Sequence, residues 1–83
     1  MKITANGMYR LNQKHSMSKS VVYIAGNPGG ATLTLKVFDI PLVDGVMTPN
    51  VQYEVHHGVG VNLMAEISGG SGINAEIHCV GIH

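Results

Sequence analysis

The residues with the most chemical potential in this chain are its five histidines and its single cysteine. His56 and His57 are adjacent in an extended stretch, so their side chains should point to opposite sides and cannot ligate one ion. The other histidines do not have the spacing of a metal-binding pair, and Cys79 has no second cysteine to join it. We therefore expect no metal ion and no cofactor within one chain, although a symmetry axis could gather one histidine from each of several subunits.

A second arrangement would combine an acid, an amide and an imidazole. If residues 51–57, 59–67 and 73–80 are neighbouring strands, Asn62 faces both Glu54 and His78. The two outer side chains would then lie about 10 Å apart, too far for a direct acid–imidazole hydrogen bond. An ordinary solvated or interface-facing row accounts for the same three residues. Because nucleophile elbows and phosphate loops are also lacking, the sequence predicts no enzyme and no catalytic residue.

Alternating apolar residues on both sides of Ser68-Gly69-Gly70-Ser71-Gly72 determine how these polar groups would be positioned. Such a period of two is typical of half-buried strands, and the glycines allow a tight reversal. We expect a hairpin with Ile67 opposite Ile73 and with one face against the core. The alternating residues are Val61, Leu63, Ala65 and Ile67, then Ile73, Ala75, Ile77 and Cys79.

Residues 20–25 and 31–38 predict a second pair of strands, joined by Gly26-Asn27-Pro28-Gly29-Gly30. Pairing Tyr23 with Leu33 would place the odd-numbered residues of both strands on the core. The opposite face would then carry Val22, Ile24 and Phe38, which is too apolar for a solvated surface. We therefore expect that face to be partly covered, either by other parts of the chain or by another subunit.

The remaining segments add strands but no convincing helix. Residues 51–57 alternate as a strand, Pro41 excludes residues 40–42 from a central strand, and residues 43–46 are typical of a hairpin turn. With six to eight short strands, the expected fold is all-β, a small antiparallel β-sandwich or barrel. Residues 1–83 form one domain in this interpretation, with residues 1–19 as a possible basic N-terminal strand or arm.

Size and charge favour association. A chain of 83 residues buries only about 60 to 65% of its unfolded surface. Apolar residues make up 45% of it, charged residues 12%, and the formal net charge is zero, which favours a homo-oligomer. The five basic residues precede all five acids, so the two blocks could pair within the fold, pair between subunits, or contact different partners. Zero net charge argues against nucleic acid as a binding partner. No run of residues is apolar enough for a signal peptide or a membrane span.

Three stretches, GGATLTLKV, VQYEVHHGVGVNLMAEISGGSG and NAEIHCVGI, resemble small all-β structural proteins encoded among the virion genes of tailed bacteriophages. The likeness covers about two thirds of the chain and brings no functional positions with it. It implies a subunit of an assembled particle: a head decoration or cement protein, often trimeric, or a small head-to-tail or tail component.

We therefore expect a virion structural protein, made in the host cytoplasm, whose partners are copies of itself and the major capsid protein or another virion protein. The favoured interpretation is a capsid decoration protein that stabilises the head as a symmetric oligomer. The alternative is a tail-associated adaptor or receptor-binding β-domain. The predicted contact residues are Val22, Ile24 and Phe38 for subunit packing, and Arg10, Lys14 and Lys19 for an acidic capsid surface.

Overall fold

The computed structural model describes residues 1–11 and 18–82, and these residues form eight strands and no helix. The all-β prediction of six to eight short strands is confirmed. The strands are β1 (Lys2–Ile3), β2 (Gly7–Arg10), β3 (Lys19–Asn27), β4 (Thr32–Val37), β5 (Ile40–Val46), β6 (Gln52–His56), β7 (Met64–Ser68) and β8 (Asn74–Ile82).

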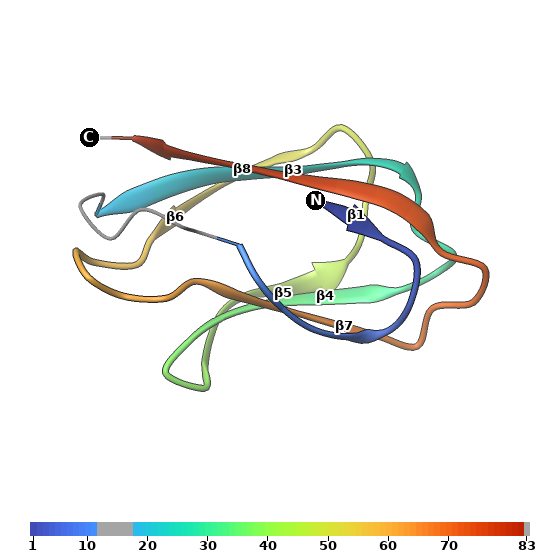
Figure 1. Cartoon of the computed structure of the whole chain (residues 1–83), viewed down its shortest axis with the longest axis horizontal. Helices are drawn as coiled ribbons and strands as arrows, with labels where there is room; N and C mark the ends of the chain where they lie inside the picture. The colour runs from blue at the N-terminus through green and yellow to red at the C-terminus, as the bar shows by residue number, and fades with distance from the viewer. Residues whose placement is uncertain (12–17, 83) are drawn as a thin grey trace.

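The strands form two antiparallel sheets that stack as a sandwich (Figure 1). Sheet A has the order β1-β8-β3-β6 and sheet B the order β2-β7-β4-β5. Pairing is symmetric about the middle of the chain, because β4 pairs with β5, β3 with β6, β2 with β7 and β1 with β8. The chain is thus one long hairpin rolled up so that successive pairs alternate between the sheets. This is the strand arrangement of a jelly roll.

The rolled topology corrects the predicted hairpins. In the described part of the chain, only β4 and β5 are consecutive strands that pair side by side, and β7 and β8 lie in different sheets. The predicted pairing of Ile67 with Ile73 is therefore wrong, although both residues are buried as expected. Alternation identifies the inward face of a strand. It does not distinguish a turn within one sheet from a connection that crosses the core.

The inward face of β3 was predicted wrongly. Val22 and Ile24 are fully buried, whereas Val21 and Tyr23 face outward. β3 pairs with β8 and β6 rather than with β4, so the register assumed for Tyr23 and Leu33 does not exist. Both faces of β3 are apolar, so its own pattern cannot determine which one is inside. Val22 and Ile24 consequently cannot serve as subunit contacts.

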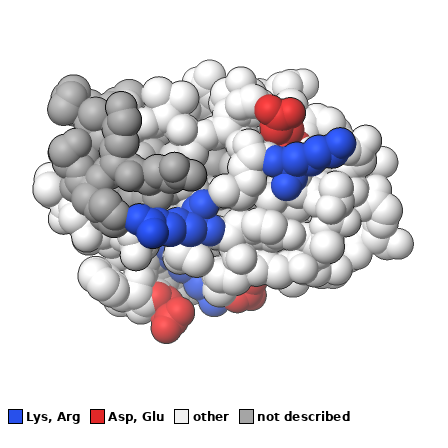
Figure 2. Space-filling view, viewed as in Figure 1, with Lys and Arg blue, Asp and Glu red and all other residues white. Residues whose placement is uncertain are grey.

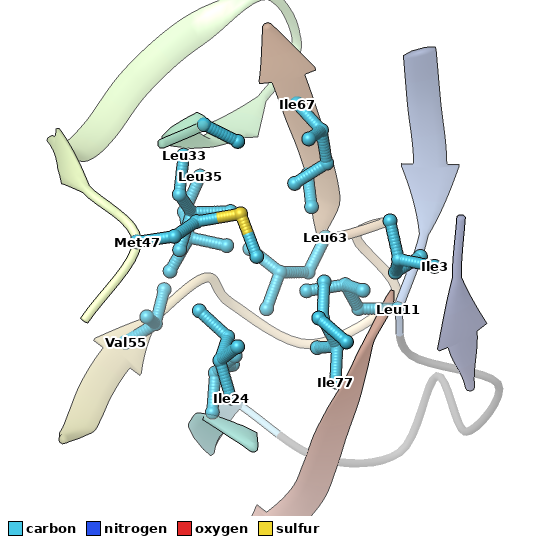
Figure 3. Packing of buried hydrophobic residues seen from close by; sticks show 14 of the residues in the cluster. Ile3, Leu11, Ile24, Leu33, Leu35, Met47, Val55, Leu63, Ile67 and Ile77 are labelled. Atoms are coloured by element: carbon cyan, nitrogen blue, oxygen red, sulfur yellow. The ribbon is translucent and has the colours of Figure 1, made fainter. Parts of the chain in front are cut away.

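The core is filled by residues from both sheets and from the segments between strands (Figure 3). Ile24 and Ile77 of sheet A face Leu33, Leu35 and Ile67 of sheet B across the interior. Leu11, Met47 and Leu63, which lie outside the strands, close the remaining space. One chain therefore supplies its own core, and an interaction with another molecule must use the outer surface.

Candidate functional site

The polar row predicted from Glu54, Asn62 and His78 is not formed. Glu54 lies opposite Val21 on β3, His78 lies opposite Tyr23, and Asn62 precedes β7 of the other sheet. Each acid on this face instead pairs with the histidine two residues further along its own strand. Glu54 lies 3.2 Å from His56 and Glu76 lies 3.2 Å from His78. The predicted row required consecutive strands to be neighbours in one sheet. Because the connections cross between the two sheets, these strands are not neighbours and the row does not form.

A buried polar cluster escaped the sequence analysis. Ser20 Oγ lies 2.8 Å from His57 Nε2, and His57 Nδ1 lies 2.9 Å from the carbonyl oxygen of Gly58. Because a carbonyl only accepts, Nδ1 donates to it and Nε2 accepts the hydroxyl proton of Ser20. Burial raises the pKa of the Cys79 thiol, and a side-chain hydrogen bond with Ser20 partly lowers it again. His57 and Ser20 are 37 residues apart in sequence, so no local motif could have revealed the cluster.

This cluster is buried and ties two segments of the fold together. Ser20 is 1% exposed and His57 is 6% exposed. The backbone amides of His57 and Gly58 both donate to the carbonyl oxygen of Ser18, so the segment after β6 is held against the start of β3. Burial also leaves the Cys79 thiol largely protonated, which makes it a poor nucleophile. We therefore assign the cluster a structural role.

Two other kinds of site are also not found in the described residues. Within residues 1–11 and 18–82, no three His, Cys, Asp or Glu side chains gather closely enough to hold a metal ion. The same residues contain no helix with the length and hydropathy of a transmembrane span.

The β4–β5 turn carries a residue that the fold itself does not favour. Phe38 and Asp39 form a two-residue turn with φ angles of +51° and +62°, a backbone conformation that normally selects Asn-Gly. A bulky L-residue in this region costs about 1 to 2 kcal/mol. The Phe38 side chain is 79% exposed, so packing within the chain offsets little of that cost. Backbone strain of this kind is a reason to look for a binding role.

Exposed apolar side chains continue from the turn into β5, the edge strand of sheet B. Ile40 is 62% exposed, Leu42 is 43% exposed and Val46 is 67% exposed. β5 has one charged residue, Asp44, which accepts a hydrogen bond from Thr34 at 3.3 Å. Figure 1 shows the turn, in green at the lower left, projecting away from the body of the sandwich. Figure 2 shows blue and red side chains separated by white surface on the face in view. We name Phe38, Ile40 and Leu42 the apolar hairpin.

The apolar hairpin is suited to side-chain contacts rather than to strand addition. Pro41 lacks an amide proton, and the register shift opposite Leu35 and Lys36 leaves Leu42 as an extra residue in β5. Proline and bulges on an edge strand both hinder pairing with another strand. Residues 43–46 were predicted to be a turn, but they belong to β5, and the actual turn comes five residues earlier.

The predicted basic contacts are distributed over both sheets. Arg10 ends β2 in sheet B, Lys19 begins β3 in sheet A, and Lys14 lies outside the described residues. Lys36 donates to Glu66 at 3.0 Å, so one pair from the two oppositely charged blocks is neutralised within the fold. Of the three predicted apolar contacts, Phe38 is on the surface and Val22 and Ile24 are not.

Comparison with known proteins identifies no relative: no family model, no curated protein and no solved structure matches the chain. The likeness to phage virion proteins therefore stays a prediction. The fold and the surface together describe a small jelly roll with a projecting apolar hairpin.

Proposed function

We propose that this chain is a bacteriophage virion structural protein, a capsid decoration or cement protein that binds the head surface as a symmetric homo-oligomer, most simply a trimer. The observation that carries the proposal is Phe38, a strained and exposed aromatic residue at the tip of a projecting hairpin. Jelly rolls are among the architectures used for viral capsid domains, which agrees with this role. Since a fold alone does not specify a function, the hairpin is the stronger support.

The mechanism is mechanical. Burying the side chains of Phe38, Ile40 and Leu42 in apolar pockets would stabilise a contact by several kcal/mol, at about 1.5 to 3 kcal/mol for each fully buried side chain. A symmetric oligomer on a symmetric shell makes several such contacts at once, which multiplies their effect. Arg10, Lys14 and Lys19 are the proposed contacts to acidic groups of neighbouring subunits or of the capsid. A bridged shell then resists internal pressure better than a bare one.

The alternative is a tail-associated adaptor or receptor-binding domain. Jelly rolls also form lectin domains, so the same architecture is compatible with a role at one end of the virion. In that case the apolar hairpin would attach the domain to the tail, and one of the other surfaces would contact the receptor.

The test uses particles of the phage that encodes the chain, prepared with its gene deleted. Purified wild-type protein should bind these heads at regular surface positions in cryo-electron micrographs and raise the temperature at which they release DNA. Phe38→Ser should lose binding. Val59→Ser is the matched control, because Val59 is 67% exposed on a loop outside the hairpin and should keep it. Labelling confined to the tail would select the alternative, and wild-type protein that binds neither structure would refute both.

A further inference from the structure

The outer faces of the two sheets differ in composition. On sheet B the exposed polar groups satisfy one another, as Lys36 does with Glu66 and Thr34 with Asp44. On sheet A an apolar strip lies along the middle of the face. Val21 and Val80 are cross-strand neighbours on β3 and β8, and Val80 is 57% exposed. This face is the more suitable one to cover with protein.

The strip on sheet A has the composition of an interface core with a polar rim. Tyr23 stacks on His78 with ring centroids 4.6 Å apart, and this pair extends the apolar surface next to Val21 and Val80. We name Val21, Tyr23, His78 and Val80 the β3–β8 patch. Glu54 and Glu76 border it, and each carboxylate lies 3.2 Å from Nε2 of the histidine two residues further along its own strand.

The apolar hairpin and the β3–β8 patch are separate surfaces. The hairpin extends from the edge of sheet B, whereas the patch lies on the outer face of sheet A, in the opposite layer of the sandwich (Figure 1). A contact that joins two different surfaces of identical molecules is heterologous. Such contacts repeat head to tail and close into a ring when the rotation between copies allows it.

Charge distinguishes this contact from a symmetric one between two hairpins. The tip of the hairpin carries one charge, the exposed carboxylate of Asp39. Two hairpins packed on each other would bring the two Asp39 side chains together, which is unfavourable. On the patch, Val21 lies opposite Glu54, and Lys19, two residues before Val21 on β3, offers a cation to an incoming Asp39. A hairpin at the Lys19 end of the patch therefore brings opposite charges together, whereas a hairpin on a hairpin brings like charges together.

We propose that the apolar hairpin of one copy docks on the β3–β8 patch of a second copy, with Phe38 against the Tyr23–His78 pair and Asp39 towards Lys19. The inference rests on the proposed function, because it defines the contact that builds the homo-oligomer. It assigns Lys19 to the subunit interface and leaves Arg10 and Lys14 as the proposed capsid contacts. Every copy uses one hairpin and one patch, so a closed ring leaves neither surface exposed.

The test is a complementation experiment followed by analytical ultracentrifugation over a wide concentration range. Phe38→Ser removes the hairpin contact, Val80→Lys removes the patch, and each variant alone should be monomeric. An equimolar mixture should form a one-to-one dimer, because the intact hairpin of the Val80→Lys variant meets the intact patch of the Phe38→Ser variant. Wild type and the Val59→Ser control should form the closed oligomer. Circular dichroism and urea unfolding establish that every variant is folded.

A charge exchange tests the orientation of the contact. Asp39→Lys should weaken association roughly threefold to fivefold, and combining it with Lys19→Asp should restore the wild-type affinity. The inference is overturned if either apolar variant assembles like wild type, if their mixture stays monomeric, or if the combined charge variant is weaker than the single one.

Failure of the inference can be separated from failure of the proposed function. A wild-type chain that remains monomeric in solution but binds heads through Phe38 would overturn the ring and leave the virion role intact. A chain that forms the ring through these two surfaces but binds no particle would support the contact and refute the decoration role.

Discussion

Replacing Phe38 with asparagine should make the isolated chain more stable while removing the proposed binding contact. Asparagine adopts positive φ angles readily, so the substitution relieves about 1 to 2 kcal/mol of backbone strain at φ +51°. The side chain is 79% exposed, so only about a fifth of it is covered, and its loss costs about 0.3 to 0.6 kcal/mol of the ~1.5 to 3 kcal/mol for full burial. The net gain is about 0.5 to 1.5 kcal/mol.

The gain is measured by urea unfolding, followed by circular dichroism, in protein dilute enough to be monomeric, because self-association would add its own stability. In a thermal scan each kcal/mol corresponds to about 4 to 8 °C for a domain of this size. Two further variants separate strain from contact. Phe38→Ala keeps most of the strain and loses the side chain, so it should not gain stability. Asp39→Gly relaxes the other turn residue at φ +62° and should be more stable while the Phe38 contact is kept.

The opposite result would refute the reasoning about the hairpin. If Phe38→Asn destabilises the monomer by more than about 1 kcal/mol, Phe38 supports the fold and its exposure says nothing about binding. If the variant is more stable but still assembles and still binds particles, the strain is real and the anchor lies elsewhere.

Three other substitutions or reactions test the fold around the site. Ser20→Ala should lower the free energy of unfolding by about 1 to 3 kcal/mol, because it leaves the buried His57 Nε2 without its hydrogen-bond partner. Urea titration measures this change, and an unchanged free energy would show that the hydrogen bond is dispensable. Gly26→Ala should lower the free energy of unfolding by at least about 1 kcal/mol more than Gly60→Ala does. Both glycines have positive φ, but of these two positions only Gly26 would bring a Cβ against a carbonyl oxygen, at 2.6 Å. Equal melting temperatures of the two variants would contradict this. The Cys79 thiol should react with an aromatic disulfide at least roughly tenfold more slowly in the folded chain than in the urea-unfolded chain. The reason is that burial raises the pKa of the thiol and shields it from the reagent. Equal rates in the two states would show an accessible thiolate.

Sequence periodicity predicted well which residues of most strands face inward. Leu33, Leu35 and Val37 of β4 and Ala65 and Ile67 of β7 are buried as their alternation indicates. The reason is local, because every second residue of a strand points to the same side whichever strand lies beside it. β3 is the exception. Its odd-numbered and even-numbered residues are both apolar, so the choice of face depends on the topology and not on the strand itself.

Topology could not be derived from the turns. Gly26-Asn27-Pro28-Gly29-Gly30 and Ser68-Gly69-Gly70-Ser71-Gly72 are typical of hairpins, yet both connect one sheet with the other. At Gly29 the backbone amide of Ser71 donates to the carbonyl oxygen at 3.0 Å, so the two crossing turns lie side by side and bond each other. Such a contact between segments 42 residues apart is a property of the rolled chain. The signal that predicts a tight reversal is the same for both kinds of connection.

The proposed binding surface consists of apolar residues that are not buried in the core. The expectation that small size requires partner subunits to complete the core is not supported for Val22 and Ile24, because one chain encloses them fully. Phe38 gives an independent reason to expect a partner. A turn selected for stability alone would carry Asn-Gly, and an edge strand selected for solubility would carry charges where Ile40 and Leu42 are exposed. Both departures occur on the same hairpin, next to a proline and a bulge that prevent uncontrolled strand pairing. A surface that is apolar but protected against sheet extension is best explained by a specific contact that uses its side chains.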